Sequence, residues 1–197
     1  MICLPNSIMV VVGTPGAGKT SVLTGLKSAT RIEHTIVNIG TLMEEMAVTK
    51  GYAKDRDQLR YMPNEKIAEL RRATFGAVAK MPGNVIVDTH ATIEQHGRYV
   101  PGLPRSETML LEKGLTALVC VDASTEEILT RRSQDKTRKR EVEDARFVEM
   151  QRIINLSTLS SYSLSLNIPL YVIDNKQGML EHSVRRFAEI AEEVFNK

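Results

Sequence analysis

Residues 13–20 of this 197-residue chain read Gly13-Thr14-Pro15-Gly16-Ala17-Gly18-Lys19-Thr20. The apolar run Ile8–Val12 precedes them, and Ser21 continues into a helical pattern. This is the pattern G-x-x-x-x-G-K-[ST] between a strand and a helix, in which glycines let the backbone curl so that successive N–H groups face one phosphate. The positive end of the helix dipole adds to that site. The stretch therefore predicts a phosphate-binding P-loop in an α/β fold.

The P-loop predicts a nucleotide site without telling which reaction it serves. Lys19, which we expect at an exposed helix start, can reach the β and γ phosphate oxygens, and the Thr20 hydroxyl can ligate Mg²⁺. We assign all of Gly13–Ser21 to the ATP phosphates. GTPases, ATPases and kinases share this loop, so the loop and its fold leave these classes open.

Five short apolar runs alternate with helical patterns along the chain. These runs are Ile8–Val12, Thr35–Ile39, Asn84–Val87, Thr116–Val121 and Pro169–Ile173. Continuous apolar runs suit a parallel sheet that helices cover on both faces. The order of the patterns therefore predicts an α/β fold with a doubly wound five-stranded parallel sheet. No repeat, linker or low-complexity segment divides residues 1–197, so we expect a single P-loop domain.

Two carboxylates end neighbouring apolar runs, where open α/β sheets bind ligands. Asp88 follows Val85–Val87 and is our candidate for the acid on the Mg²⁺ side, acting directly or through water. Asp122 ends the next run, but the capping box that begins at Ser124 favours a carboxylate in the turn before a helix. His90 fits a base or phosphate contact and a hydrogen-bonded loop histidine about equally well.

A basic segment follows the helix that Ser124 opens, because six of the ten residues from 131 to 140 are Lys or Arg and one is acidic. A solvated basic turn is one interpretation. A phosphoryl-transfer enzyme also needs arginines over the transferring group, so we favour a short lid at about residues 134–143 that closes over the phosphates. A helix start at Thr41 and the side chain of Arg60 are weaker signals of a second phosphate site.

The composition argues against several other classes of protein. Apolar residues make up 42% of the chain and charged residues 25%, as in globular proteins, and a net charge of +2 does not by itself indicate nucleic acid. No apolar run approaches the ~18 residues of a membrane span, and Met1–Ser7 lacks the basic start of a signal peptide, so we expect a cytoplasmic protein. Cys3 and Cys120 fit no disulfide or zinc pattern, and we expect Cys120 to be buried and inert.

Read together, these segments resemble archaeal-type adenylate kinases over almost the whole chain. Eight ordered stretches carry the resemblance. They are Gly13–Thr20, Val37–Thr41, Asp55–Arg60, Val87–Thr92, Tyr99–Pro104, Ile128–Arg132, Arg138–Arg140 and Asn175–Lys176. The resemblance implies reversible phosphoryl transfer from ATP·Mg to AMP, giving two ADP, with Mg²⁺ as the cofactor. It also implies a homotrimer.

The resemblance implies roles for individual residues as well. Arg131 would lie by the ATP base, next to the loop of Asn175 and Lys176. Arg138 and Arg140 would close over the phosphates, so that these two arginines, Arg131 and the P-loop lysine stabilise the charge of the transferring group. The AMP site would be formed by Gly40, Thr41, Asp88, His90 and, on the AMP phosphate, Arg60.

The chain departs from the better-known bacterial and eukaryotic adenylate kinases at two places. They have Asp-Gly-Phe-Pro-Arg where this chain has Asp88–Thr92, so their arginine for the AMP phosphate is missing here, and Arg98 is a candidate replacement. The lid segment is also short and lacks the four-cysteine zinc insert of some relatives.

Two alternatives remain open from the sequence. One is a kinase for another small acceptor, such as CMP, UMP, shikimate or gluconate. The other is a P-loop ATPase that acts as an RNA-associated assembly factor, in which the basic segment would bind RNA. The stretch Asn175–Gly178 resembles the Asn-Lys-x-Asp of GTPases, but Gly178 stands where the base-reading Asp belongs, which counts against GTP.

Overall fold

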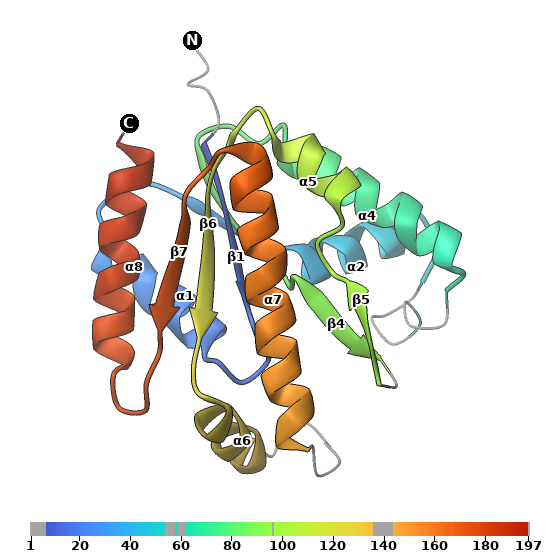
Figure 1. Cartoon of the computed structure of the whole chain (residues 1–197). Coiled ribbons are helices and arrows are strands. Elements are labelled where there is room, and N and C mark those ends of the chain that lie inside the picture. The colour runs from blue at the N-terminus through green and yellow to red at the C-terminus, as the bar shows by residue number, and fades with distance from the viewer. Residues whose placement is uncertain (1–6, 54–57, 59–61, 96, 136–143, 197) are drawn as a thin grey trace.

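The computed structural model describes residues 7–53, 58, 62–95, 97–135 and 144–196. Five parallel strands form the main sheet in the order β2-β3-β1-β6-β7 (Figure 1). They are β1 Ser7–Gly13, β2 Thr35–Asn38, β3 Asn84–Asp88, β6 Leu115–Asp122 and β7 Leu170–Asp174. Each corresponds to one of the five apolar runs, so the predicted parallel sheet is confirmed.

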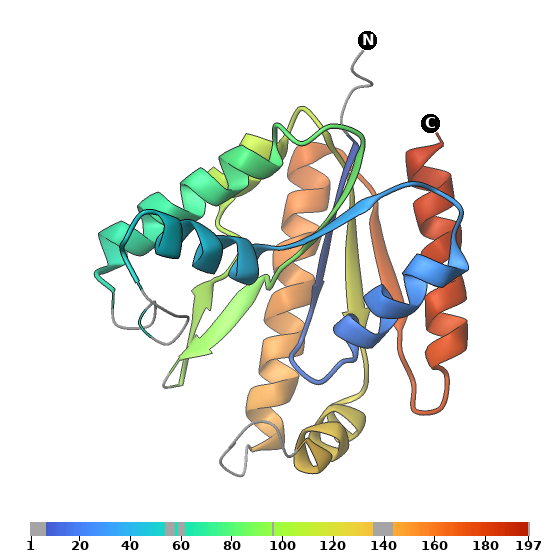
Figure 2. The same ribbon diagram turned by 180° about the vertical axis from the view of Figure 1, so that it is seen from behind.

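Helices cover both faces of this sheet, as Figures 1 and 2 show from opposite sides. One face is covered by α1 (Lys19–Ala29) and α8 (Leu180–Phe195). The other face is covered by α4 (Asn64–Val78), α5 (Arg105–Leu111) and α7 (Ala145–Leu166). The doubly wound arrangement expected from the sequence is therefore confirmed.

Two further helices flank the carboxyl end of the sheet. α2 (Ile39–Thr49) follows β2 and packs against α4, and α6 (Thr125–Gln134) follows β6 and packs against α7. Among the described helices, none combines the length and apolarity needed to cross a membrane.

The alternation of side chains along β1 creates two hydrophobic layers. Ile8 and every second residue after it pack with Phe75 of α4 and Leu159 of α7. Met9 and Val11 point to the opposite face and pack with Phe187 of α8. Because period-two alternation buries both faces of the central strand, the loop that follows β1 is held at the middle of the sheet edge.

A hairpin that the sequence did not predict leaves the main sheet after β3. Its strands are β4 (Thr92–Gln95) and β5 (Arg98–Pro101), which pair antiparallel. Both strands are only four residues long and mostly exposed, so they lack the apolar run that identified the other strands.

The boundary between β2 and α2 differs from the prediction. The sequence indicated a strand through Ile39 and a helix start at Thr41, whereas α2 begins at Ile39. The reason is a side-chain cap, since Asn38 Oδ1 accepts a hydrogen bond of 3.0 Å from the N–H of Thr41. The predicted helix start was therefore wrong by two residues.

Candidate active site

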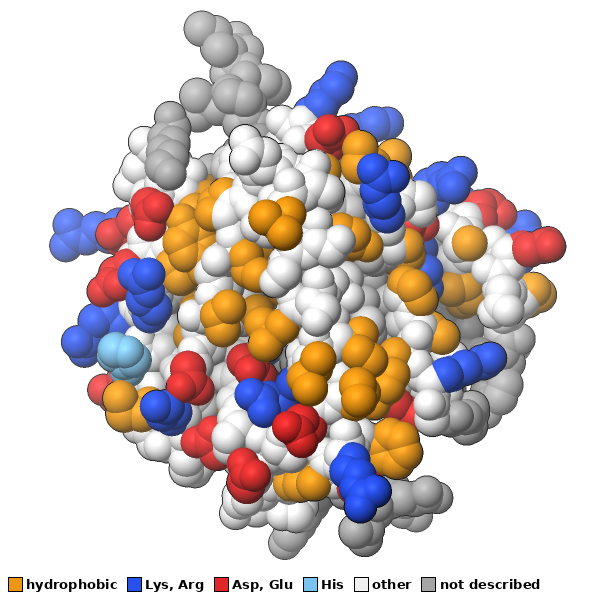
Figure 3. Space-filling model, viewed as in Figure 1, with side chains coloured by type: hydrophobic (Ala, Val, Ile, Leu, Met, Phe, Trp, Pro, Cys, Tyr) orange, Lys and Arg blue, Asp and Glu red, His pale blue; other side chains and the backbone are white. Residues whose placement is uncertain are grey.

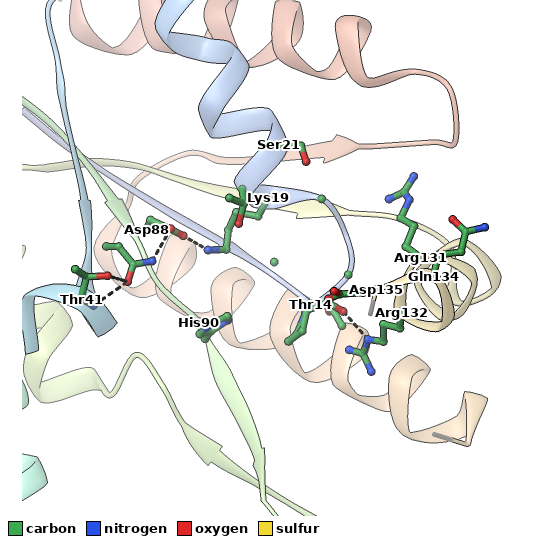
Figure 4. Close-up of a pocket in the computed structure, with 16 residues that line it drawn as sticks. Thr14, Lys19, Ser21, Thr41, Asp88, His90, Arg131, Arg132, Gln134 and Asp135 are labelled. Carbon is green, nitrogen blue, oxygen red and sulfur yellow. Dashed lines mark hydrogen bonds and ion pairs between the residues drawn. The ribbon is translucent and has the colours of Figure 1, made fainter. Parts of the chain in front are cut away.

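A cavity of about 640 Å³ opens at the carboxyl end of the sheet (Figure 4). Its wall is formed by residues 13–16 and 18–21 of the P-loop, by the last turn of α6 with Asp135, and by Asn38, Thr41, Asp88 and His90. The fold therefore brings the segments expected on the donor side and on the acceptor side of the reaction to one place.

The P-loop bends at two glycines, Gly16 with φ 93° and Gly18 with φ 91°, a region that other residues rarely adopt. A Cβ atom on Gly18 would also clash with Nδ2 of Asn175. Gly18 is the N-cap of α1, and within the described chain no side chain caps this helix. The first N–H groups of α1 are therefore available to an anion such as a nucleotide phosphate.

Lys19 is buried at the start of α1, so the expectation of an exposed helix start was wrong. The loop after β1 folds against neighbouring β3, where Val11 lies opposite Asp88 in register. Nζ of Lys19 contacts Oδ1 of Asp88, while Asp88 Oδ2 accepts a hydrogen bond of 2.7 Å from Nδ2 of Asn38. Burial lowers the pKa of Lys19 to about 8. Asn38 was missed as a site residue, although an Asn between a strand and a helix is a capping signal.

Two residues of the cavity wall carry oxygen atoms that suit a divalent cation. Thr20 is exposed and lines the cavity, and the carboxylate of Asp88 is buried in its wall. Within the described residues, no three His, Cys, Asp or Glu side chains gather into a metal site of their own. Hydroxyl and carboxylate oxygens suit Mg²⁺, which usually takes substrate phosphates and water as its other ligands. Thr20 and Asp88 therefore fit a Mg²⁺ ion that arrives with a nucleotide.

Two arginines of α6 hold the backbone of the P-loop. Arg131 donates through Nη1 to the carbonyl oxygen of Ala17 at 3.2 Å and through Nη2 to that of Asn175 at 2.7 Å. Arg132 donates through Nε to the carbonyl oxygen of Pro15 at 2.7 Å. From the sequence we expected Arg131 beside the ATP base, whereas Arg132 was counted only among the charges of the basic segment. Both arginines connect the helix that leads to the predicted lid with the P-loop.

Asn175 and Lys176 follow β7, and of these two described residues Asn175 contacts the P-loop. Nδ2 of Asn175 donates to the carbonyl oxygen of Ala17 at 2.8 Å, and its side chain is buried. Lys176 is exposed, its Nζ lies 3.4 Å from Oδ2 of Asp174, and it does not line the cavity.

Asp122 does not line the cavity, because it pairs with Arg152 of α7. The pair is bidentate, with Nε to Oδ1 at 2.9 Å and Nη2 to Oδ2 at 2.8 Å. Ser124 and Glu127 form the predicted capping box at the start of α6. A carboxylate in the turn before this helix was the favoured interpretation and is confirmed. Its partner Arg152 could not be found from spacing, because it lies 30 residues along the chain.

The structure assembles part of the expected acceptor side. Thr41 and His90 line the cavity, whereas Gly40 in the first turn of α2 does not. The N–H of Thr41 is already bonded to Asn38. Arg98 is exposed at the start of β5 and does not line the cavity. Outside the described residues lie most of the predicted lid and three predicted site residues, Arg60, Arg138 and Arg140.

Comparison with known structures places the fold among small-molecule kinases. Shikimate kinase from Bacteroides thetaiotaomicron superposes with a TM-score of 0.53 at 15% identity, covering 94% of this chain and 98% of that one. Shikimate kinase from Acinetobacter baumannii gives a TM-score of 0.50 at 17% identity, covering 98% and 94%. At these identities the likeness concerns the fold alone.

Comparison with known sequences identifies the family. The profile of the family described as "AAA domain" matches residues 12–149. An adenylate kinase of Methanothermobacter thermautotrophicus is 34% identical over 187 residues, which cover 94% of this chain and 99% of that protein. An adenylate kinase of Methanocaldococcus jannaschii is 33% identical over 192 residues, covering 95% and 99%. With a P-loop kinase fold and this similarity over nearly its whole length, the chain belongs to the adenylate kinase family of phosphotransferases.

Proposed function

We propose that this adenylate kinase moves the γ-phosphoryl group of ATP·Mg reversibly to AMP, giving two ADP. An oxygen of the AMP phosphate forms the new bond to the γ phosphorus while the bond from that phosphorus to the β–γ bridging oxygen breaks, so that ADP leaves. The AMP phosphate is already ionised, and no general base is needed. The observation that carries the proposal is the shared cavity, in which the P-loop with Lys19 faces the start of α2 with Thr41.

On the donor side, residues 13–21 would bind the ATP phosphates, with Lys19 on the β and γ oxygens. When bound, Mg²⁺ supplies positive charge to these oxygens, and Thr20 and Asp88 would hold it directly or through water. Arg131, Asn175 and Lys176 would lie beside the ATP base. The hydrogen bond from Arg131 to the Asn175 carbonyl supports this proposal, since it joins Asn175 to a residue that lines the cavity.

On the acceptor side, we propose that Arg60 binds the AMP phosphate. Gly40, Thr41, Asp88 and His90 would complete the AMP site. The position of Thr41 and His90 in the wall of the same cavity as Lys19 supports this assignment.

The lid is our next proposal. Residues of about 134–143, with Arg138 and Arg140, would close over the phosphates, expel water and stabilise the charge that develops on the transferring group. The contacts of Arg131 and Arg132 with the P-loop support it, because they anchor α6, from which this segment leaves. Residues 1–197 would form a single kinase domain that includes this lid.

A homotrimer and a cytoplasmic location are also proposals. Phe147, Met150 and Ile153 are exposed at spacings of three on α7, and Ile93 is exposed on β4, a strand that contacts this helix. Figure 3 shows hydrophobic side chains gathered over α7 and the hairpin, and such a patch supports self-association. The proposed cytoplasmic location is supported by the charge of ATP and AMP. Because such nucleotides do not cross membranes freely, an enzyme that uses them works in the compartment that holds them. Light scattering should give three times the mass of the 22.0 kDa chain, and Ile153→Asp should lower it.

A coupled assay with ATP and a panel of nucleoside monophosphates tests the reaction. We expect AMP to be phosphorylated at least about tenfold faster than CMP or UMP at equal concentration. Arg60→Ala should raise KM for AMP about tenfold and leave KM for ATP within about twofold. Arg72→Ala, which removes an exposed arginine of α4, serves as the matched control and should change neither. Faster turnover with another acceptor would contradict the proposed substrate.

A further inference from the structure

A buried asparagine of α7 joins two segments that approach the active site from different parts of the fold. Asn155 is 2% exposed. Its Nδ2 donates to Oγ1 of Thr14 at 3.1 Å, and its Oδ1 accepts from Oγ1 of Thr92 at 2.7 Å. Both ends of one amide are therefore used, one on Thr14, which lines the cavity, and one on Thr92, which follows the cavity residues Asp88 and His90 in the chain.

The amide nitrogen of Asn155 contacts the P-loop, where the phosphates of ATP would bind. Thr14 is the second residue of the P-loop and is 3% exposed. Its backbone carbonyl accepts a hydrogen bond of 2.9 Å from the N–H of Ala17, which closes the turn of the loop. A displacement of Thr14 would therefore change the shape of the loop that holds the donor phosphates.

The second end is at the root of the β4–β5 hairpin. Thr92 starts β4, four residues after Asp88 and two after His90, both of which line the cavity. The carbonyl oxygen of Ala91 accepts from the N–H groups of Gly102 and Leu103 at 2.9 and 3.2 Å, so the hairpin closes tightly at this point. The segment 88–92 thus moves with Thr92.

Asn155 lies in a part of α7 that is packed against the core on both sides of it in the sequence. On one side of Asn155 along α7, Val148 packs with Ala17 and Ile128, and on the other Leu159 packs in the main hydrophobic layer. Both residues are at most 1% exposed. Because the helix is fixed at both sides of Asn155, its amide can set the spacing between Thr14 and Thr92.

We infer that Asn155 is a positioning residue for phosphoryl transfer, which holds the P-loop at a fixed distance from segment 88–92. This inference rests on the proposed transfer to AMP. Asn155 does not line the cavity, and it acts through Thr14 and Thr92 on the alignment of the attacking oxygen with the γ phosphorus. A misplacement of about 1 Å at the reacting atoms is enough to lower a rate about 100-fold.

The test removes the connection with near-isosteric changes. Thr92→Val and Asn155→Leu should each lower kcat at least about tenfold, while KM for ATP and for AMP stay within about threefold. The share of ATP that is hydrolysed to phosphate instead of transferred should rise, because water competes for a misaligned γ phosphorus. Thr92→Ser keeps the hydroxyl and should retain a near-normal kcat and share of transfer.

A matched control separates positioning from stability. Thr74→Val also removes a buried hydroxyl, one that donates to the carbonyl oxygen of Leu70 within α4, away from the cavity. It should lower the melting temperature without changing the share of ATP that is transferred.

A double variant tests whether the two residues act together. Asn155→Leu combined with Thr92→Val should lower kcat little more than either single variant does, because each single variant already breaks the same connection.

Several outcomes would overturn the inference. If Thr92→Val has the kcat of the wild-type protein and transfers the same share of ATP to AMP, Asn155 does not position the reaction. This conclusion holds whether or not Asn155→Leu folds. Equal effects of Thr92→Val and Thr92→Ser, or additive effects in the double variant, would also contradict it. If the unchanged protein phosphorylates no AMP at all, the proposed function fails first and the inference with it.

Discussion

The ammonium of Lys19 contacts the carboxylate of Asp88, although one belongs to the start of α1 and the other to the end of β3. The parallel pairing of β1 with β3 brings these two positions together at one edge of the sheet. Both residues line the cavity, so the pair places opposite charges in its wall. In the proposed mechanism, ATP·Mg would redirect both groups, with Lys19 turning to the phosphate oxygens and Asp88 to the cation.

The first prediction concerns the lysine itself. Lys19→Met keeps most of the buried stem and removes the charge, so we expect kcat to fall about 100- to 1000-fold, as when one group that stabilises transition-state charge is lost. Circular dichroism should show an unchanged helix content. Turnover close to that of the unchanged protein in folded Lys19→Met would mean that the P-loop does not hold the donor phosphates.

The second prediction is a pH dependence of ATP binding. Burial places the pKa of Lys19 at about 8, so above this pH the free enzyme loses the charge that attracts phosphate, and KM for ATP should rise up to about tenfold per pH unit. Lys19→Arg stays charged and should bind a fluorescent ATP analogue without this dependence.

Unfolding does not account for such a change. The folded-state pKa of Lys19 lies below its ordinary value of 10.5, so between pH 8 and 10.5 the unfolded chain binds more protons than the folded one. The contribution of this group to the free energy of unfolding therefore increases with pH. A KM for ATP that stays constant between pH 7 and 9.5 would contradict the prediction.

The third prediction compares Asp88 and Asp122, the carboxylates that end β3 and β6 on either side of β1. Asp88→Asn should raise the Mg²⁺ concentration needed for half-maximal kcat at least about tenfold, and it should also lower stability, because it leaves the buried Lys19 without its carboxylate. Asp122→Asn breaks the pair with Arg152 and should lower the free energy of unfolding by about 2 kcal/mol, because it leaves a partly buried guanidinium without its carboxylate. Its Mg²⁺ dependence should be normal. A raised Mg²⁺ requirement in Asp122→Asn together with a normal one in Asp88→Asn would refute the assignment of Asp88 to the metal.

The sequence was sufficient for the features that short-range patterns encode. The P-loop is a contiguous motif, the five strands are continuous apolar runs, and the Ser124 capping box has a fixed spacing, so all three could be predicted. Cys120 is buried as expected, and burial raises the pKa of its thiol to about 12, which keeps it inert.

Features that depend on distant residues could not be predicted. Asn155 meets Thr14 across 141 positions and Thr92 across 63, and no local pattern encodes such contacts. The burial of Lys19 likewise follows from the β1–β3 pairing, whereas the motif alone indicates a residue at a helix end. The missed start of α2 is different, since Asn38 is a capping residue and the signal was present.

The fourth prediction concerns two glycines within helices. A Cβ on Gly25 of α1 would lie 2.6 Å from Cγ2 of Val184, a branched side chain of α8 that cannot easily move. Gly25→Ala should therefore lower the free energy of unfolding by about 1–3 kcal/mol, and Val184→Ala in the same chain should recover part of that loss. Gly76 of α4 has open space around its Cβ position, so Gly76→Ala should increase the free energy of unfolding by about 0.5–1 kcal/mol. Urea titration measures both, and a stabilising Gly25→Ala would contradict the close packing of α1 against α8.

The last prediction decides between the lid and an RNA-binding role for the basic segment. If Arg138 and Arg140 stabilise the transferring phosphoryl group, replacing both with Gln should lower kcat about 1000-fold or more and change nucleotide affinity far less. Replacing both with Lys should still impair transfer, because an ammonium cannot hold two phosphate oxygens in the way a planar guanidinium does.

The control removes the same charge elsewhere. Arg185 and Arg186 are exposed on α8, so their double Gln variant should keep kcat. An RNA-binding segment would behave differently, because affinity for RNA would fall steeply with salt through counterion release and kcat would not depend on it. If the Arg138 and Arg140 double Gln variant transfers phosphate normally but loses salt-sensitive RNA binding that the control retains, the basic segment is a nucleic-acid site and the lid proposal is wrong.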